Sequence, residues 1–176
     1  QVGKFSGWIG YTLSWAWRQF DNLNFGEPYY YHFDRRHDVS IALTYKFNDK
    51  VDAGLVWVYG TGNAVTLPTE RYLAIDEVSG SNYYQGYSDN TVENFDKRND
   101  YRMAAYHRLD LSVNLKKEKE FRDLHWERTW SFGLYNAYSR KNPFYLYFSQ
   151  DNSGHRVLKQ VSLFPVIPFI SWGFKF

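Results

Sequence analysis

The chain has 176 residues, of which 44% are hydrophobic and 21% aromatic, with a net charge of +2 and no cysteine. So small a charge gives no reason to expect a nucleic-acid partner, and the lack of cysteine excludes disulfide bonds between these residues. No run approaches the roughly 18 consecutive apolar residues of a membrane helix, although strands that alternate polar and apolar residues can also cross a membrane.

The first part of the chain contains three segments that alternate between apolar residues and small or polar ones. They span 5–20, 37–47 and 51–60, and Asn48-Asp49-Lys50 forms the turn between the second and the third. The apolar positions are Phe5, Ile9, Tyr11, Leu13, Trp15, Trp17, Val39, Ile41, Leu43, Tyr45, Phe47, Val51, Ala53, Leu55, Trp57 and Tyr59. This period of two predicts β-strands with one apolar face.

The stretch 61–106 is rich in Asn, Asp, Ser, Gly and Tyr, which is typical of a loop. Two further alternating strands are expected over 107–116 and 129–138, with the charged stretch 117–128 as the turn between them. The alternation breaks at 135–138, which we interpret as a β-bulge.

The last expected strand covers 158–176 and contains Pro165 and Pro168. Because proline removes a ladder donor, we expect 158–164 to be the outer half of this strand, followed by a bend and a terminal stretch. One face of the terminal stretch carries Pro168, Ile170, Trp172, Phe174 and Phe176. This stripe resembles the C-terminal signal of bacterial outer-membrane barrels, so we expect the barrel-assembly machinery to read Trp172, Phe174 and Phe176.

These six segments predict an all-β protein made of antiparallel transmembrane β-strands. With a periplasmic C-terminus, the turns 48–50 and 117–128 are periplasmic and the longer loops 21–36, 61–106 and 139–157 are external, as is usual for outer-membrane barrels. Six strands are too few to enclose a lumen, and an open sheet edge is not tolerated in lipid. We therefore expect the chain to be the C-terminal part of a larger barrel.

Several short motifs carry a family resemblance through their order and spacing. They are His37-Asp38-Val39, Tyr45-Lys46-Phe47-Asn48, Tyr59 to Pro68, Tyr106 to Ser112, Tyr135-Asn136-Ala137-Tyr138, Asn142-Pro143 and Ser162 to Pro168. Together they resemble the late barrel strands of TonB-dependent outer-membrane receptors of the Bacteroidetes type. The resemblance implies a Gram-negative outer membrane and a plugged barrel of about 22 strands, of which residues 1–176 form the last six. The plug and the TonB box of that family are not among these residues.

By this resemblance, the whole protein binds a scarce nutrient and takes it up with energy delivered through TonB. The nutrient classes are a siderophore, a corrinoid, a glycan or a peptide. The implied partners are outer-membrane lipid, the N-terminal strands and plug of the same receptor, TonB, the barrel-assembly machinery and, as in some relatives of the family, a surface lipoprotein.

Aromatic clusters in the expected external loops are the candidate ligand-binding residues. They are Tyr29, Tyr30, Tyr31, His32, Tyr83, Tyr84 and Tyr87. Such rings stack on ligands and donate hydrogen bonds at a low cost in conformational entropy; alternatively, they pack the loops together. The charged residues of the polar face are expected to pair with one another or with a plug, namely Arg18, Lys46, Asp52, Arg108, Asp110 and Lys116.

The sequence contains no motif of a hydrolase, a zinc protease or a cysteine-rich metal site, so we expect no enzymatic activity, no cofactor and no metal. His32, Asp34, His37 and Asp38 are close in sequence, but neighbouring strand residues point to opposite faces. The acidic run from Asp89 to Asp100 reads as a solvated loop. Two alternatives stay open: a small structural or adhesive outer-membrane β-barrel, and a soluble carbohydrate-binding β-sandwich.

Overall fold

A computed structural model describes residues 3–73, 91–121 and 124–175. Apart from one 3-10 turn, η1 (Asn24–Gly26), the regular structure of these residues is β, and every strand pairing is antiparallel. The predicted all-β, antiparallel fold is therefore confirmed. The described residues contain no helix that is long and apolar enough to cross a membrane.

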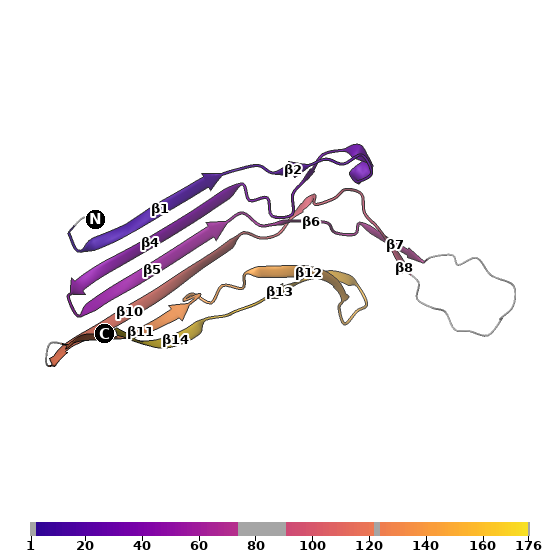
Figure 1. Cartoon of the computed structure of the whole chain (residues 1–176). Coiled ribbons are helices and arrows are strands. Elements are labelled where there is room, and N and C mark those ends of the chain that lie inside the picture. Colours follow the sequence, from indigo (N-terminus) through magenta and orange to yellow (C-terminus); the bar gives the residue numbers. More distant parts are fainter. Residues whose placement is uncertain (1–2, 74–90, 122–123, 176) are drawn as a thin grey trace. The chain divides into compact units, whose positions relative to one another are not determined.

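Six strands form one large sheet in the order in which the chain visits them (Figure 1). They are β1 (Phe5–Leu13), β4 (His37–Asn48), β5 (Val51–Gly60), β10 (Tyr106–Phe121), β11 (Leu124–Tyr135) and β14 (Ile167–Lys175). Each strand pairs with the next one, and β1 and β14 are the two edges. All six correspond to strands predicted from the alternation in the sequence.

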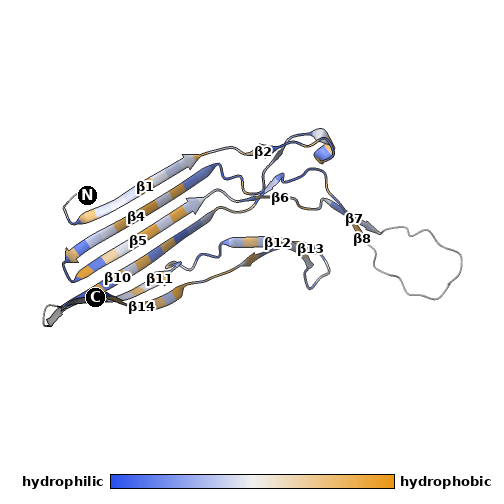
Figure 2. Ribbon diagram, viewed as in Figure 1, coloured by the Kyte–Doolittle hydropathy of each residue, from blue (hydrophilic) through white to orange (hydrophobic). Residues whose placement is uncertain are grey.

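The pairing register brings most of the large apolar residues of the six strands to one side, which we call the apolar face. It carries the odd-numbered residues of β1, β4, β5 and β10 and the even-numbered residues of β11 and β14. One row across it consists of Gly7, Leu43, Leu55, Leu111, Leu134 and Pro168. The opposite side, the polar face, carries the remaining positions. Figure 2 shows the resulting alternation of hydrophobic and hydrophilic residues along these strands.

The large sheet is a single layer without a buried core. The buried hydrophobic residues in the described parts of the chain are Tyr29, Ala64 and Met103, and none of them belongs to this sheet. On the apolar face, Ile9 is 71% exposed and Ile170 62% exposed. Within the described residues, no second layer thus covers the apolar face of the sheet.

The connections between these strands differ strongly at the two ends of the sheet. At one end, two residues separate β4 from β5 and two separate β10 from β11, whereas the connections 14–36, 61–105 and 136–166 at the other end are long. This arrangement confirms the predicted contrast between short turns and long loops. The turn after β10 is shorter than expected, because both strands of that hairpin continue into the charged stretch 117–128.

The first predicted strand, 5–20, is too long in the prediction, because β1 ends at Leu13. The chain then enters a second compact unit made of 16–34 and 63–103, which we call the loop unit. In its described residues it contains three short strand pairs, and not the continuous loops predicted for 21–36 and 61–106. The pairs are β2 (Trp17–Arg18) with β3 (Tyr29–Tyr30), β6 (Ala64–Val65) with β9 (Tyr101–Arg102), and β7 (Glu70–Leu73) with β8 (Thr91–Asn94).

The prediction for 139–164 is also wrong. Its residues form a separate hairpin of β12 (Pro143–Gln150) and β13 (Arg156–Ser162), so 158–164 is not the outer half of the last strand. The Asp151 carboxylate closes the hairpin turn by accepting hydrogen bonds from the backbone N–H groups of Ser153 and His155. This local closure favours pairing of β13 with β12 over continuation into β14.

The predicted bulge at 135–138 is the end of β11 instead. Tyr135 is the last residue of the strand, and Asn136 has a φ of 54°, a left-handed conformation that asparagine tolerates better than most residues. The Asn136 side chain donates to the carbonyls of Arg140 and Phe164 and accepts from the Arg140 N–H. These hydrogen bonds fix the point where the chain leaves the sheet.

One close cross-strand contact of the large sheet gives a test of its packing. A Cβ added to Gly133 would lie 2.5 Å from the Leu111 carbonyl oxygen and 2.4 Å from the ring of Phe169, which is paired with it. We expect Gly133→Ala to lower the free energy of unfolding by about 1–3 kcal/mol, as overpacking does. Urea denaturation followed by tryptophan fluorescence measures this.

Gly173→Ala is the matched control, because its added Cβ would find its nearest atoms 3.9 Å away, at Thr129. It lies on the same polar face of the neighbouring strand. Equal urea midpoints for the two variants would contradict the close contact at Gly133.

Candidate functional site

Aromatic rings gather on the apolar face toward the short-turn end of the large sheet. Phe5 and Tyr45 lie with ring centroids 4.6 Å apart, and Trp126 and Phe174 with centroids 5.6 Å apart. Trp172 contacts both Phe174 and the facing ring of Trp130, at 6.1 and 6.5 Å. Two of the residues predicted as an assembly signal, Trp172 and Phe174, therefore belong to this aromatic belt, and the third, Phe176, lies outside the described residues.

A second aromatic belt lies on the same face at the end with the long connections. The Tyr11 hydroxyl and His37 Nδ1 are hydrogen-bonded at 2.9 Å. His107 stacks on Tyr59 with centroids 6.5 Å apart, and its Nδ1 is hydrogen-bonded to the Tyr138 hydroxyl at 2.7 Å. The belt thus alternates phenol and imidazole rings, which combine an apolar body with a polar tip.

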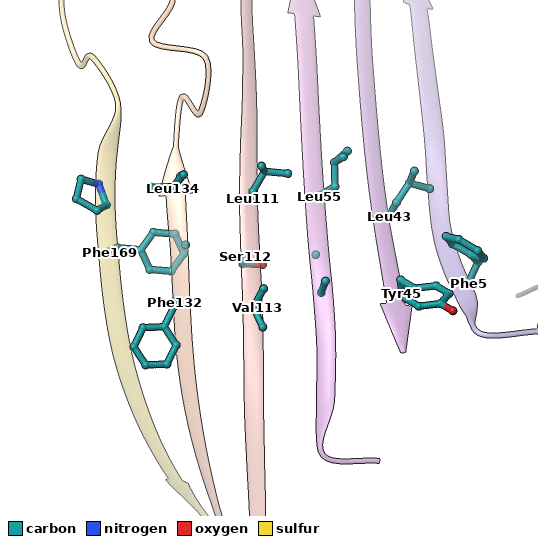
Figure 3. Close-up of a pocket in the computed structure, with 14 residues that line it drawn as sticks. Phe5, Leu43, Tyr45, Leu55, Leu111, Ser112, Val113, Phe132, Leu134 and Phe169 are labelled. Atoms are coloured by element: carbon teal, nitrogen blue, oxygen red, sulfur yellow. The ribbon is translucent and has the colours of Figure 1, made fainter. Parts of the chain in front are cut away.

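Between the belts, the apolar face is lined mainly by aliphatic side chains and is hollowed by about 690 Å³. Figure 3 shows Leu43, Leu55, Leu111 and Leu134 on four neighbouring strands. The middle of this face offers almost no polar group, so it suits hydrocarbon and not a polar ligand.

The carboxylates of the large sheet are on the polar face. Among the strand residues whose side chains the structure describes, they are Asp38, Asp52, Asp110, Glu118 and Glu127. Asp52 pairs with Lys116 at 3.0 Å and accepts a hydrogen bond from the Asn114 amide at 2.6 Å, and Arg108 pairs with Asp110 at 2.9 Å. The predicted mutual pairing of these charged residues is confirmed.

Two other charged residues of that prediction have different partners. Lys46 pairs with Asp49 in the turn at 2.7 Å, and this hydrogen bond holds the pKa of the Asp49 carboxyl below its usual value. Arg18 lies in β2 of the loop unit and not in the large sheet, because β1 ends before it.

A small pocket of about 240 Å³ lies where β10 and β11 meet the long connections. Tyr106, Arg108 and Tyr135 contribute to its lining, with Asn142 and Phe144 among the others. Arg108 donates to the hydroxyls of Tyr106 and Tyr135 and lies 4.0 Å from the centre of the Tyr135 ring. With its guanidinium held by Asp110 and the two phenols, the pocket offers aromatic walls and hydroxyl groups to a ligand.

Sequence reasoning missed this pocket. The sequence feature that indicates the pocket is the alternate spacing of Tyr106, Arg108 and Asp110, which places all three side chains on one face of a strand. Tyr135 is their partner from the next strand, and Asn136 adds a backbone N–H to Asp110 at 2.9 Å.

The predicted cluster Tyr29 to His32 lies in the loop unit, where arginines contact its rings. Tyr29 is buried beneath Arg98, Tyr30 lies between Trp17 and Arg102, and Arg18 is 4.0 Å from the ring centre of Tyr31. His32 is exposed and its Nδ1 is 2.7 Å from the Ala64 carbonyl oxygen. Tyr31 and His32 thus retain surface for a ligand, whereas Tyr29 contributes to packing. Tyr83, Tyr84 and Tyr87 lie outside the described residues.

An ion pair between the buried Asp34 carboxylate and the partly exposed Arg102 holds the loop unit together. Asp34 is 1% exposed; its carboxylate pairs with Arg102 and accepts a hydrogen bond from the Ala16 N–H at 2.6 Å. Arg102 also donates to the Asp34 carbonyl oxygen at 2.6 Å. These bonds join the segments 16–34 and 63–103. Within the described ranges, no group of three or more His, Cys, Asp or Glu side chains is placed to hold a metal ion.

Comparison with known proteins finds no matching family model, no similar curated protein and no similar solved structure. The resemblance to TonB-dependent receptors thus stays a hypothesis that rests on the residues of this chain.

The ion pair of the loop unit leads to a stability prediction. We expect Asp34→Ala to destabilise the loop unit by roughly 1–3 kcal/mol, because it removes the buried carboxylate that accepts from Arg102 and from the Ala16 N–H. Hydrogen exchange of amides in 16–34 and 63–73 measures the loss of protection.

Asp38→Ala provides the comparison, because it removes an ion pair with Arg35 in which both side chains are about 40% exposed. Such a pair contributes only about 0–1 kcal/mol. Unchanged exchange in Asp34→Ala would show that the ion pair of Asp34 and Arg102 does not hold the two segments.

Proposed function

We propose that the large sheet spans a bacterial outer membrane, with its apolar face toward lipid and its polar face toward the interior of a β-barrel. The observation that carries this proposal is a single-layer sheet whose six strands expose one continuous apolar face. In water such a face is unfavourable by about 25 cal/mol per Å² of apolar surface. Hydrocarbon removes this cost without a second protein layer.

Strand length and aromatic placement support the same assignment. The six strands contain between 9 and 16 residues, and about 9–11 residues suffice for a tilted strand to cross a bilayer. Belts of aromatic residues typically flank the apolar band of an outer-membrane barrel at both interfaces. The two belts described above flank an aliphatic band in this manner.

The open edges of the sheet support its being part of a larger barrel. Within the described residues, β1 pairs only with β4, and β14 only with β11. Each backbone group left unpaired in hydrocarbon costs several kcal/mol. Membrane insertion therefore requires further strands at both edges. We infer that these come from N-terminal strands of the same receptor, in agreement with the resemblance to a barrel of about 22 strands.

In this proposal the whole protein is a TonB-dependent receptor that takes up a scarce nutrient, such as a siderophore, corrinoid, glycan or peptide. Tyr31 and His32 of the loop unit are the external ligand contacts that the described residues support best, and the pocket beside Arg108 is a second contact on the interior side. The plug, TonB, the barrel-assembly machinery and a surface lipoprotein are the expected partners.

The soluble carbohydrate-binding β-sandwich is the main competing function. It requires a second sheet packed over the apolar face, and the exposure of Ile9, Trp172 and Ile170 argues against it. A small structural or adhesive barrel would also use the large sheet to face the membrane. In that case, the edges β1 and β14 must be closed without the strands of a larger receptor.

Neighbouring residues on opposite faces of β10 provide a direct test of the membrane proposal. The chain has no cysteine, so Leu111→Cys and Ser112→Cys each offer one site for a fluorophore. In vesicles with brominated acyl chains we expect strong quenching of the label at residue 111, on the apolar face, and little at 112. Steady-state fluorescence measures the ratio.

Equal quenching at the two positions would contradict a lipid-facing apolar face. A soluble sandwich would instead fold without detergent and bury the label at residue 111 in the absence of any lipid, which the emission maximum of the label reports.

The coding region upstream of Gln1 tests the receptor assignment separately. We expect it to encode a signal peptide, a TonB box, a plug and about sixteen further alternating strands, the remainder of a barrel of about 22 strands. Sequencing of the gene region checks this. A signal peptide directly before Gln1 would exclude the receptor and leave a small outer-membrane barrel.

A further inference from the structure

Two basic residues lie directly opposite each other on the apolar face, near the short-turn end. The register pairs Lys117 of β10 with Arg128 of β11, and Arg128 in turn with Phe174 of β14. Like charges directly opposite each other in a sheet are destabilising. A pair of this kind at the border of an apolar face indicates that an anion compensates the two charges.

The surroundings of this pair supply aromatic rings and no carboxylate from the described strand residues of the same face. Arg128 lies 4.4 Å from the centre of the Trp126 ring. The next row of the face is Leu115, Trp130 and Trp172. Tryptophan favours the level of the lipid headgroups. Lys117 and Arg128 lie within this aromatic belt, in the same row as Phe174.

The nearest carboxylates in the sequence face the other way. Glu118 and Glu127 are paired on the polar face, and Glu127 accepts a hydrogen bond from the Thr129 hydroxyl at 3.1 Å. Lys175 is opposite Glu127 on that face. In the described strand residues of the large sheet, the acidic side chains thus occupy the polar face. On the apolar face, Lys117 and Arg128 have no acidic neighbour among these residues.

We propose that Lys117 and Arg128 bind the phosphate of an anionic lipid headgroup, with the acyl chains lying along the apolar face. This inference rests on the proposed membrane position of the sheet. Arginine offers a planar fork that matches phosphate oxygens, and lysine adds a point charge. The neighbouring belt of Trp126, Trp130, Trp172 and Phe174 holds the adjoining glycerol and acyl region.

Energy transfer from tryptophan to pyrene-labelled lipid tests the site on the full chain in zwitterionic detergent micelles. Phosphatidylglycerol and phosphatidylcholine, each carrying pyrene in an acyl chain, are titrated separately, and the ratio of their affinities is measured. We expect the chain to prefer phosphatidylglycerol. Lys117→Gln and Arg128→Gln should each reduce this preference about fivefold, the usual effect of one cation near an anionic membrane surface.

Two further variants distinguish the site from a general effect of charge or folding. Lys175→Gln removes a cation at the same level but on the polar face, and we expect the preference to change less than twofold. Arg128→Lys keeps the charge and should retain most of the preference. Circular dichroism confirms that each variant keeps its β-structure.

Three results would overturn the inference. Equal affinity for the two lipids, with no effect of Lys117→Gln or Arg128→Gln, would remove the headgroup site and leave the membrane proposal intact. Displacement of the lipid by inorganic phosphate at comparable concentration would show a site for free anions. No energy transfer from either lipid would contradict the membrane position of the apolar face itself.

Discussion

The strand register is the constraint on which the rest of the structure depends. Side chains alternate between the faces of a strand, so a slip of one residue in any strand would move its apolar residues to the polar face. The row Leu43, Leu55, Leu111 and Leu134 exists only because four consecutive strands keep the same register. Both the apolar face and the ion pairs of the polar face follow from this one alignment.

Specific polar contacts hold this alignment at both ends of the sheet. At the short-turn end, the Asn48 side chain accepts a hydrogen bond from the Lys50 N–H at 2.8 Å, which closes the turn between β4 and β5. At the other end, Asn142 accepts from the His107 N–H and donates to the His107 carbonyl oxygen. The amide of Asn142 thereby takes the place of a neighbouring strand residue. Asn142 and Arg108 both line the small pocket at this end of the sheet.

Alternation in the sequence was sufficient to predict β4 and β5 almost to the residue, because a tight turn and a strict period of two mark their limits. It failed where polar residues continue a strand: 117–121 belongs to β10 although its charges read as a turn. The basic pair Lys117 and Arg128 was missed for this reason. Trp17 was assigned to the first strand because its parity fits, although a pairing with Tyr30 places it in the loop unit. The odd or even position of a residue predicts which face of its strand it occupies, but it does not predict which strand is the neighbour.

The two units of the chain obtain their stability from different sources, and this difference bears on function. The loop unit buries Tyr29, Ala64 and Met103 and closes around the ion pair of Asp34 and Arg102. It therefore has the elements of a small folded body in water. The large sheet has hydrogen-bonded strands but no buried apolar residue in its described part. Backbone pairing alone contributes little net stability against water, which is why we propose an apolar environment for the exposed face of this sheet. A loop unit with a buried carboxylate and a sheet with an exposed apolar face together agree with the proposed position at a boundary between water and lipid.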